Sequence, residues 1–137
     1  MNIKILENES AKNFVNTDNN FRTILDDVYI KEWIEEKNVK IYLLYEDSKL
    51  KSFVLITKLA KDPEKLHKNP VYVNYIYTFQ EFRKKGFALK LLNELKIIEE
   101  MTVFCTDDIV KNLFIKAQFK FLKMDPFCKA FPIYRFP

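Results

Sequence analysis

The sequence predicts an α/β fold, in which helices pack on a mixed α+β sheet, within one domain that spans residues 1–137. The length of 137 residues, with 48% hydrophobic and 15% aromatic side chains, is typical of one well-packed core. In the second half, strand-like and helix-like patterns alternate as strand-helix-strand twice, which favours locally parallel pairing inside a mixed sheet. The sequence shows no internal repeat, low-complexity tract or linker, and this favours a single domain.

The first third of the chain predicts one strand and two helices. Residues 2–6 alternate between polar and apolar side chains and predict a short strand. Ser10 is expected to cap a short helix through Val15, which ends at the polar segment 17–20. From Phe21 to Trp33, apolar residues recur at helical spacing and predict a second, amphipathic helix. Its other face is acidic, with Asp26, Asp27, Glu32, Glu35 and Glu36.

A hairpin and an exposed loop are expected next. Residues 39–45 and 50–59 are strand-like, and the polar segment 46–49 joins them as a turn. Residues 61–70 contain two prolines and several charges and predict an exposed loop. This loop holds His67, the only histidine, with no ligand partner at a suitable spacing. We therefore expect His67 to be solvated and predict no metal site.

The second half predicts four strands and two helices. Residues 71–78 are β-branched and aromatic and predict a strand. Apolar residues at helical spacing predict a long helix over 88–98 and a shorter one capped by Thr106 or Asp107. Further strands are predicted at 101–106, 119–124 and 130–136. The full order is β-α-α-β-β-β-α-β-α-β-β.

The only glycine of the chain, Gly86, lies between the strand 71–78 and the helix 88–98. Such a position favours either a positive φ or a backbone left bare for a ligand. Free N–H groups at the start of the helix, its dipole and the cations Arg83, Lys84 and Lys85 suit a phosphate or pyrophosphate. An ordinary turn with solvated lysines is the alternative, and the local sequence does not decide between the two.

Charge and composition restrict the compartment and the partners only in part. The formal net charge of +4 permits anionic partners without requiring nucleic acid. We find no signal peptide and no apolar run approaching 18 residues, so we expect a cytoplasmic or nuclear protein that is neither secreted nor bound to a membrane. Cys105 and Cys128 lack metal or redox spacing and are expected to be free thiols. No histidine is available to activate Cys105, so it is not favoured as a nucleophile.

The order of the elements and the glycine segment together resemble the GNAT superfamily of acetyl-CoA-dependent N-acetyltransferases. The phosphate motif of that family is Arg or Gln, two residues, Gly, one residue, then Gly or Ala, and Arg83, Gly86 and Ala88 match it. Residues 107–119 resemble a second family block, in which a capped helix flanks the coenzyme. The resemblance implies a GNAT-like domain with acetyl-CoA as cosubstrate. The residues it implies as coenzyme contacts are Ile76, Tyr77, Thr78, Arg83, Lys84, Lys85, Gly86, Phe87, Ala88, Asp107, Val110 and Phe114.

Three residues depart from the family pattern. Phe114 stands where the family often has a tyrosine that can protonate the leaving thiolate, and Gln118 stands where it has a glycine. Tyr72 stands where some members hold a glutamate base. We therefore expect proton transfer through a water molecule held by Tyr72 or Asn74, with Tyr75 as a further candidate.

Two functional hypotheses follow. The first is transfer of an acetyl group from acetyl-CoA to a primary amine: a polyamine-like small amine, a lysine side chain or a protein N-terminus. A cationic acceptor would be drawn to the acidic helix, although those carboxylates are also compatible with an ordinary solvated face. The alternative is a weak or inactive module of the same fold that binds CoA or a protein partner, which Phe114 and the missing glutamate favour.

A nucleic-acid binder is a weaker hypothesis, because the sequence lacks a cluster of Arg with interleaved aromatic residues. The sequence leaves the oligomeric state open, a homodimer included.

Overall fold

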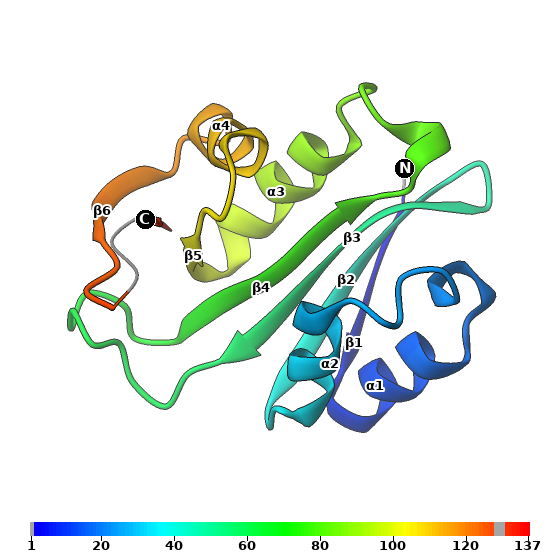
Figure 1. The fold of residues 1–137 in the computed structure, drawn as a ribbon, viewed down its shortest axis with the longest axis horizontal. Helices are drawn as coiled ribbons and strands as arrows, with labels where there is room; N and C mark the ends of the chain where they lie inside the picture. The colour runs from blue at the N-terminus through cyan, green and yellow to red at the C-terminus, as the bar shows by residue number, and fades with distance from the viewer. Residues whose placement is uncertain (1, 128–130) are drawn as a thin grey trace.

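The computed structural model describes residues 2–127 and 131–137, which form a seven-stranded mixed sheet with helices on both faces (Figure 1). The strands are β1 (Asn2–Glu7), β2 (Val39–Glu46), β3 (Lys49–Lys58), β4 (Pro70–Thr78), β5 (Glu100–Phe104), β6 (Lys120–Met124) and β7 (Pro132–Phe136). The helices are α1 (Asn8–Thr17), α2 (Val28–Glu35), α3 (Phe87–Ile98) and α4 (Asp108–Lys116). The predicted α/β fold with a mixed sheet is therefore confirmed.

The order of the strands across the sheet is β1-β2-β3-β4-β5-β7-β6. The crossover through α3 joins β4 to β5 as direct parallel neighbours, as the alternating pattern predicts. The crossover through α4 joins β5 to β6, but β7 lies between these two strands and pairs antiparallel with both. Only the first of the two strand-helix-strand passages therefore gives direct parallel pairing.

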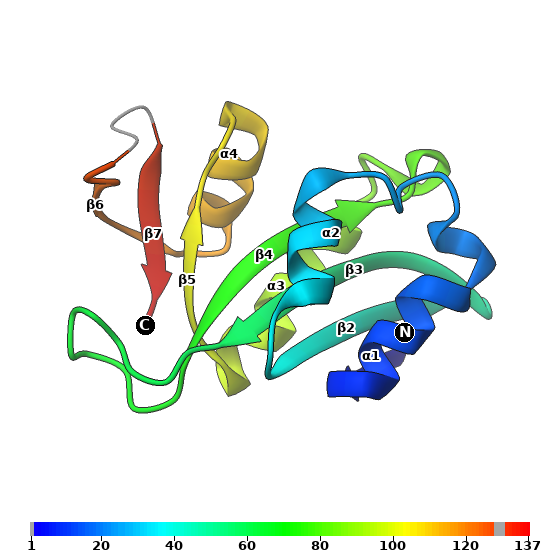
Figure 2. The same ribbon diagram turned by 60° about the horizontal axis from the view of Figure 1, so that its bottom comes forward.

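The sheet separates two hydrophobic cores. Helices α1 and α2 cover one face, while α3 and α4 cover the other (Figures 1 and 2). Strand β3 contributes alternate residues to both cores, with Phe53 and Leu55 on the α1–α2 side and Val54 and Ile56 on the α3–α4 side. Because both faces of β3 are buried, the strand reads as a continuous apolar run instead of an alternating one.

Strand β4 contains a bulge and then leaves its parallel neighbour. Its register against β3 shifts at Leu55 and Ile56, so that Asn74 has no partner residue on β3. The pairing of β4 with β5 ends at Val73 and Val103, and beyond this point the two strands diverge (Figure 2). The divergence leaves an opening in the sheet beside the bulge.

The expected single helix from Phe21 to Trp33 is wrong. A 3-10 turn at Asn19–Phe21 and a further turn precede α2, which begins at Val28. Asp27 is the N-cap of α2, and its Oδ1 accepts a hydrogen bond from the Tyr29 backbone N–H at 2.9 Å. The apolar spacing is satisfied without a continuous helix, because the aspartate side chain stabilises a helix start at this position.

Helix α2 is anchored beside the bulge of β4. Trp33 is fully buried, and its indole Nε1 donates to the Ile56 carbonyl oxygen at 3.1 Å. Ile56 lies at the register shift opposite the bulge, so this hydrogen bond fixes α2 over the irregular part of the sheet. The start of α2 is thereby held close to the opening between β4 and β5.

The expected capping of the first helix by Ser10 is also wrong, since α1 begins at Asn8, directly after β1. The turn between β2 and β3 is confirmed. Its central residues, Asp47 and Ser48, have φ angles of 54° and 61°, as expected for a tight hairpin turn.

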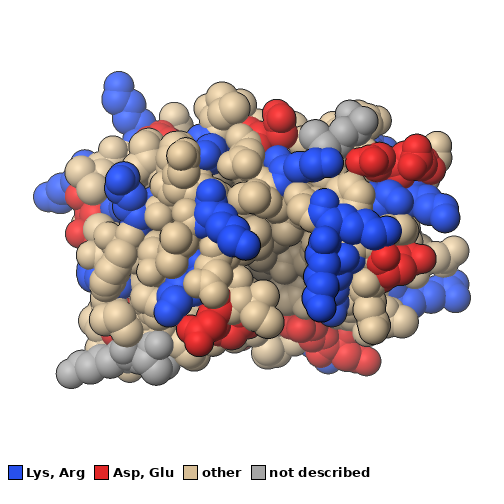
Figure 3. Space-filling model, turned by 90° about the horizontal axis from the view of Figure 1, so that it is seen from above, with Lys and Arg blue, Asp and Glu red and all other residues tan. Residues whose placement is uncertain are grey.

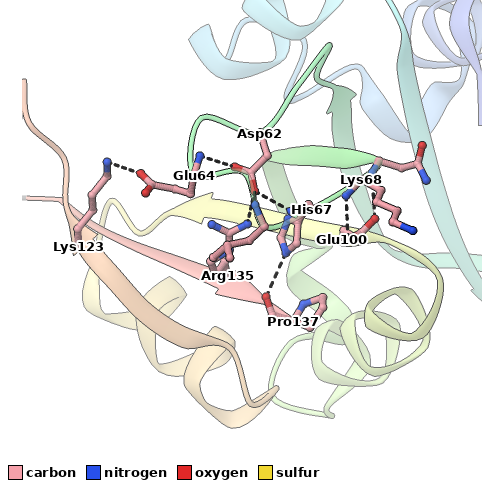
Figure 4. A network of polar contacts seen from close by, with 10 residues as sticks. Asp62, Glu64, His67, Lys68, Glu100, Lys123, Arg135 and Pro137 are labelled. Carbon is pink, nitrogen blue, oxygen red and sulfur yellow. Dashed lines mark hydrogen bonds and ion pairs between the residues drawn. The ribbon is translucent and has the colours of Figure 1, made fainter.

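The expected exposure of His67 is wrong as well. Asp62 accepts hydrogen bonds from three backbone N–H groups of its own loop and from Arg135 Nη2 on β7 at 2.6 Å (Figure 4). His67 is 8% exposed, and its Nε2 lies 3.0 Å from the Pro137 carbonyl oxygen. The loop folds inward because Asp62 gathers four donors, one of which is 73 residues away in the chain.

Within residues 2–127 and 131–137, no three His, Cys, Asp or Glu side chains gather closely enough to hold a metal ion. None of the helices in the described part of the chain combines the length and the apolar character that spanning a bilayer requires.

Candidate functional site

Gly86 occupies the junction between β4 and α3 with a left-handed backbone. Its φ is +82°, and it forms the N-cap of α3. Glycine has no side chain that could accept from the N–H groups of the first helical turn, so α3 begins without a side-chain cap. A Cβ built at this position would meet no atom of the described residues within 4 Å. The predicted positive φ is confirmed, and the space in front of the glycine is open.

A pocket of about 740 Å³ lies over this junction, between the end of β4, the start of α3 and one side of α4. We call it the basic pocket. It is lined by Ile76, Tyr77, Thr78, Phe82, Arg83, Lys84, Gly86, Phe87, Ala88, Leu89, Ile109, Val110, Asn112, Leu113 and Lys116. Of the described residues that line it, three are cations and none is a carboxylate. Seen from above, Lys and Arg side chains lie on both sides of a hollow on this side of the molecule (Figure 3).

Arg83 and Lys84 differ in how they are held. The Arg83 Nε atom donates to the Thr78 carbonyl oxygen at 2.8 Å, and its guanidinium lies 5.1 Å from the centre of the Tyr77 ring. Arg83 therefore ties the loop back to the end of β4 as well as bringing charge to the pocket. Lys84 is exposed and has a φ of 64°, while Lys85 is exposed and does not line the pocket.

Two other expected coenzyme contacts also lie outside the basic pocket. The Asp107 side chain accepts from the Val110 backbone N–H at 2.8 Å and caps α4, as one of the two predicted caps. Phe114 is fully buried, and its ring packs edge to face against Phe119 at 4.8 Å. Asp107 is thus a helix cap and Phe114 a core residue, and neither lines the basic pocket; their contact with a coenzyme stays a prediction.

Gln118 has a φ of 69°, the left-handed conformation that favours glycine. The following N–H, of Phe119, donates to the Phe114 carbonyl oxygen at 3.0 Å, which closes the end of α4. The backbone thus keeps the shape that the family's glycine would give, although the residue differs.

A second pocket, of about 470 Å³, occupies the opening where β4 and β5 diverge. We call it the acidic pocket. It is lined by Asp27, Tyr29, Glu32, Tyr72, Val73, Asn74, Tyr75, Ile76, Val103, Phe104, Thr106, Asp107 and Val110. Among the described lining residues, three are carboxylates and none is a Lys or Arg. Ile76 and Val110 line both pockets, so the two cavities meet there.

The two catalytic candidates, Tyr72 and Asn74, both line the acidic pocket. The Thr57 hydroxyl donates to Asn74 Oδ1 at 2.7 Å, which orients the amide of the bulge residue. The Tyr72 ring packs edge to face on Phe104 at 5.2 Å, and burial raises the pKa of its phenol. Tyr72 is therefore protonated at neutral pH and can donate a hydrogen bond to water.

Tyr75, the further candidate, contacts the start of α2. Its hydroxyl donates to Asp27 Oδ2 at 3.1 Å. Burial, followed by the negative charge of Asp27, raises the pKa of the Tyr75 phenol. Tyr75 thus stays protonated and holds the Asp27 carboxylate at the rim of the acidic pocket.

Several residues that line the pockets were not predicted from the sequence. On α4 these are Ile109, Asn112, Leu113 and Lys116, which follow each other at i, i+3, i+4 and i+7. That spacing defines one helix face, and the exposed Ile109 is a signal that the face has a further role. The role of Asp27 was missed because its place in the pocket depends on where α2 begins.

Cys105 is 2% exposed, and burial raises the pKa of its thiol to about 11. A neutral thiol of this kind is a poor nucleophile at neutral pH, as expected. Cys128 lies outside the described residues.

No protein-family model and no curated protein sequence matches this chain. Solved structures do match. GCN5 of Tetrahymena superimposes with a TM-score of 0.66 at 15% identity, over 99% of this chain and 95% of that one. NAA60 of Arabidopsis thaliana in complex with acetyl-CoA superimposes with a TM-score of 0.59 at 16% identity, over 98% of both chains.

The PaiA N-acetyltransferase of Thermoplasma acidophilum in complex with coenzyme A gives a TM-score of 0.58 at 18% identity, over 99% of both chains. These superpositions cover nearly the whole chain, so the likeness extends to the complete domain. The protein has the fold of the GNAT superfamily of N-acetyltransferases, and the predicted resemblance is confirmed at the level of the fold.

Proposed function

We propose that the protein is an N-acetyltransferase that moves an acetyl group from acetyl-CoA to a primary amine. The observation that carries this proposal is the pair of pockets with opposite charge that meet at Ile76 and Val110, in the opening between β4 and β5. One pocket suits a polyanionic coenzyme and the other suits a cationic acceptor. Their junction is the place where a thioester and an amine can come into contact.

The basic pocket is proposed to bind acetyl-CoA. Its pyrophosphate would lie at Gly86 and the first turn of α3, with Arg83 and Lys84 beside it and Lys116 on the facing side. The pantetheine arm would follow Ile76, Tyr77 and Thr78 of β4, and Phe87, Ala88 and Val110 would pack against the ligand. Lys85 would add only long-range charge, because it does not line the pocket.

The single glycine supports a ligand at this place. Seven other described residues adopt a positive φ with a side chain present: Asn8, Asn38, Asp47, Ser48, Lys65, Lys84 and Gln118. Positive φ alone therefore does not require glycine in this chain. Because no protein atom of the described residues would touch a Cβ at Gly86, we infer that the space is kept open for a bound ligand.

The junction of the two pockets supplies what acetyl transfer needs. Beyond Val73, no described strand pairs with the edge of β4 that faces β5, so backbone N–H groups are available to the thioester oxygen. The amine nitrogen forms a bond to the carbonyl carbon as the carbon–sulfur bond breaks. One ammonium proton passes to solvent through water held by Tyr72 and Asn74, and a second ends on the sulfur of the free thiol.

A second candidate function is a weak or inactive module that binds CoA or a protein partner. The burial of Phe114 favours it, because this position offers no hydroxyl to the leaving thiolate. The absence of a glutamate at Tyr72 favours it as well. Proximity and orientation still supply a large part of the barrier reduction in the transfer, so we place the enzyme first.

Ligand-dependent melting curves test the proposal. Acetyl-CoA and CoA should raise the melting temperature, AMP should raise it less, and single-stranded DNA should not raise it. At a hundredfold excess over Kd, binding to the native state adds about 2.7 kcal/mol of stability. Thiol release from acetyl-CoA over a panel of amines then separates the enzyme from the binding module. Stabilisation by DNA that falls steeply with salt, without any effect of CoA, would contradict both.

A further inference from the structure

The acidic pocket contains negative charge that the protein itself does not neutralise. Within the described residues, neither Asp27 nor Glu32 forms an ion pair, whereas the neighbouring Asp26 lies 3.6 Å from Lys31 Nζ. Asp27 is half-buried, which lowers the screening of its charge by solvent. A cavity that holds unpaired carboxylates and no described cation is suited to a positively charged guest.

The position of these carboxylates within the pocket decides which part of an acceptor they meet. The inner end of the pocket, at Ile76 and Val110, is shared with the basic pocket and must receive the reacting nitrogen. Asp27 and Glu32 come from the opposite side, from α2 and the residue that caps it. They therefore face the part of the acceptor that is remote from the reacting amine.

Asp27 is held in a fixed orientation. Its Oδ1 accepts from the Tyr29 N–H at 2.9 Å, and its Oδ2 accepts from the Tyr75 hydroxyl at 3.1 Å. The Tyr29 and Tyr75 rings lie 6.5 Å apart, centre to centre, and both line the pocket beside this carboxylate. Aromatic faces next to a carboxylate form a favourable site for an ammonium group.

We propose that the acidic pocket selects acceptors that carry a second positive charge away from the reacting amine, and that Asp27 is the residue that binds this second charge. The proposal rests on the proposed acetyl transfer and names its acceptor class as dibasic amines. Asp27 acts on specificity, while the reaction itself takes place at the other end of the pocket. Glu32, which is exposed at the rim, adds to the same field.

Three amines of similar length test this selectivity: 1,4-diaminobutane, 1-aminobutane and 4-aminobutanoate. Each carries a primary amine at one end, and the other end is positive in the diamine (its second amine), neutral in 1-aminobutane and negative in 4-aminobutanoate. The wild-type protein should show the highest kcat/KM with the diamine and the lowest with 4-aminobutanoate. The difference should lie in KM, because the remote charge is bound equally in the ground state and in the transition state.

Asp27→Asn is the decisive variant, since asparagine also caps helices. Its Oδ1 can still accept from the Tyr29 N–H, and its Nδ2 can donate to the Tyr75 hydroxyl oxygen in place of the bond that Asp27 Oδ2 accepts. It should lower the preference for the diamine over 1-aminobutane by about three- to tenfold. Asp26→Asn makes the same charge change one residue away, at a fully exposed side chain outside the pocket, and should leave the preference within about twofold. A diamine preference that survives in Asp27→Asn, or that is absent from the wild type, would overturn the proposal.

A binding measurement separates this inference from the proposed function. Calorimetric titration of 1,4-diaminobutane into CoA-saturated protein should show binding by the wild type and by Asp26→Asn, and three- to tenfold weaker binding by Asp27→Asn (roughly one charge contact). If the diamine binds in this way but is never acetylated, the proposed transfer fails and the cation site stands. If amines are acetylated without regard to the far charge, the transfer stands and the cation site fails.

Discussion

The basic and the acidic pocket differ in how firmly their charges are held. Arg83, Lys84 and Lys116 of the basic pocket are exposed side chains, and they act together with backbone N–H groups at a helix start. Asp27 of the acidic pocket is half-buried and fixed by two hydrogen bonds. Affinity in the basic pocket should therefore be spread over many contacts, whereas selectivity in the acidic pocket should depend on one residue. The two pockets should therefore need different mutations to be disabled.

Gly86→Asp is expected to have the largest effect on the basic pocket. It places a carboxylate where the diphosphate should approach, and acetyl-CoA affinity should fall about 100-fold, or about 2.7 kcal/mol. Gly86→Asn is the matched control, because asparagine has nearly the same size and also tolerates a positive φ. It should lose about tenfold or less. Equal losses of affinity in both variants would mean that the added side-chain volume, and not its charge, causes the effect. Unchanged acetyl-CoA affinity in a folded Gly86→Asp protein would contradict a phosphate site in this segment.

Phe114→Tyr tests whether α4 contributes to the chemistry or only to the core beneath the pockets. The new hydroxyl would be buried at a position that is 0% exposed, and without a partner it should cost about 1–3 kcal/mol of unfolding free energy. Urea unfolding measures this cost, and acetyl-CoA affinity should change little. Phe121→Tyr adds the same group to a half-exposed ring and should be within about 0.5 kcal/mol of the wild type. Unchanged stability together with faster thiol release would show that Phe114 reaches the reacting sulfur.

The adjacent residues Lys84 and Lys85 test whether contact with the basic pocket matters beyond charge alone. Lys84 lines the basic pocket and Lys85 does not. Lys84→Ala should weaken acetyl-CoA binding by about 1 kcal/mol, roughly fivefold, through the loss of one charge-assisted hydrogen bond. Lys85→Ala, which removes the same charge from the same loop, should have less than half of that effect. Isothermal titration at two salt concentrations distinguishes them, and equal losses would mean that only long-range charge matters here.

Gln118→Gly should change the protein least among these four substitutions, and it should stabilise the fold instead of weakening it. The left-handed conformation at this position costs less with glycine, so unfolding free energy should rise by about 0.5–1 kcal/mol. Gln118 Oε1 also accepts from Lys96 Nζ at 3.1 Å, which reduces the gain. Thermal unfolding measures the net change, and coenzyme affinity should stay constant. A loss of stability would mean that the Lys96 hydrogen bond outweighs the backbone strain.

The difference between the pockets also explains which of them could be predicted from the sequence. The basic pocket is built mostly from one continuous segment, residues 76–89, so a local motif around Gly86 was sufficient to place it. The acidic pocket combines α2, β4, β5 and the start of α4. Tyr72 and Asn74 were predicted as candidates from the strand β4 and do line this pocket, whereas Asp27, which also lines it, was predicted only as part of an acidic helix face.

Two structural features, the β4 bulge and the inward fold of the loop around Asp62, could not be predicted from local sequence patterns. The bulge at Asn74 depends on the register between β3 and β4, which no single strand specifies. The inward fold of the loop around Asp62 depends on Arg135, at the other end of the chain. Helical spacing from Phe21 to Trp33 was also ambiguous, since burial of Phe21 and Ile24 is achieved by turns as well as by a helix.

The divergence of β4 and β5 has a consequence for the order of kinetic events. The basic pocket is lined by α3 and α4, whereas the acidic pocket is lined on one side by α2 and its cap Asp27, and α2 and α3 pack on opposite faces of the sheet. Neither ligand has to pass through the place of the other, so both can be bound at once and each can depart independently. Because the buried Cys105 thiol offers no covalent acetyl carrier, initial-rate plots against the two substrates should intersect instead of running parallel, as for a ternary complex in which the acetyl group moves once and directly.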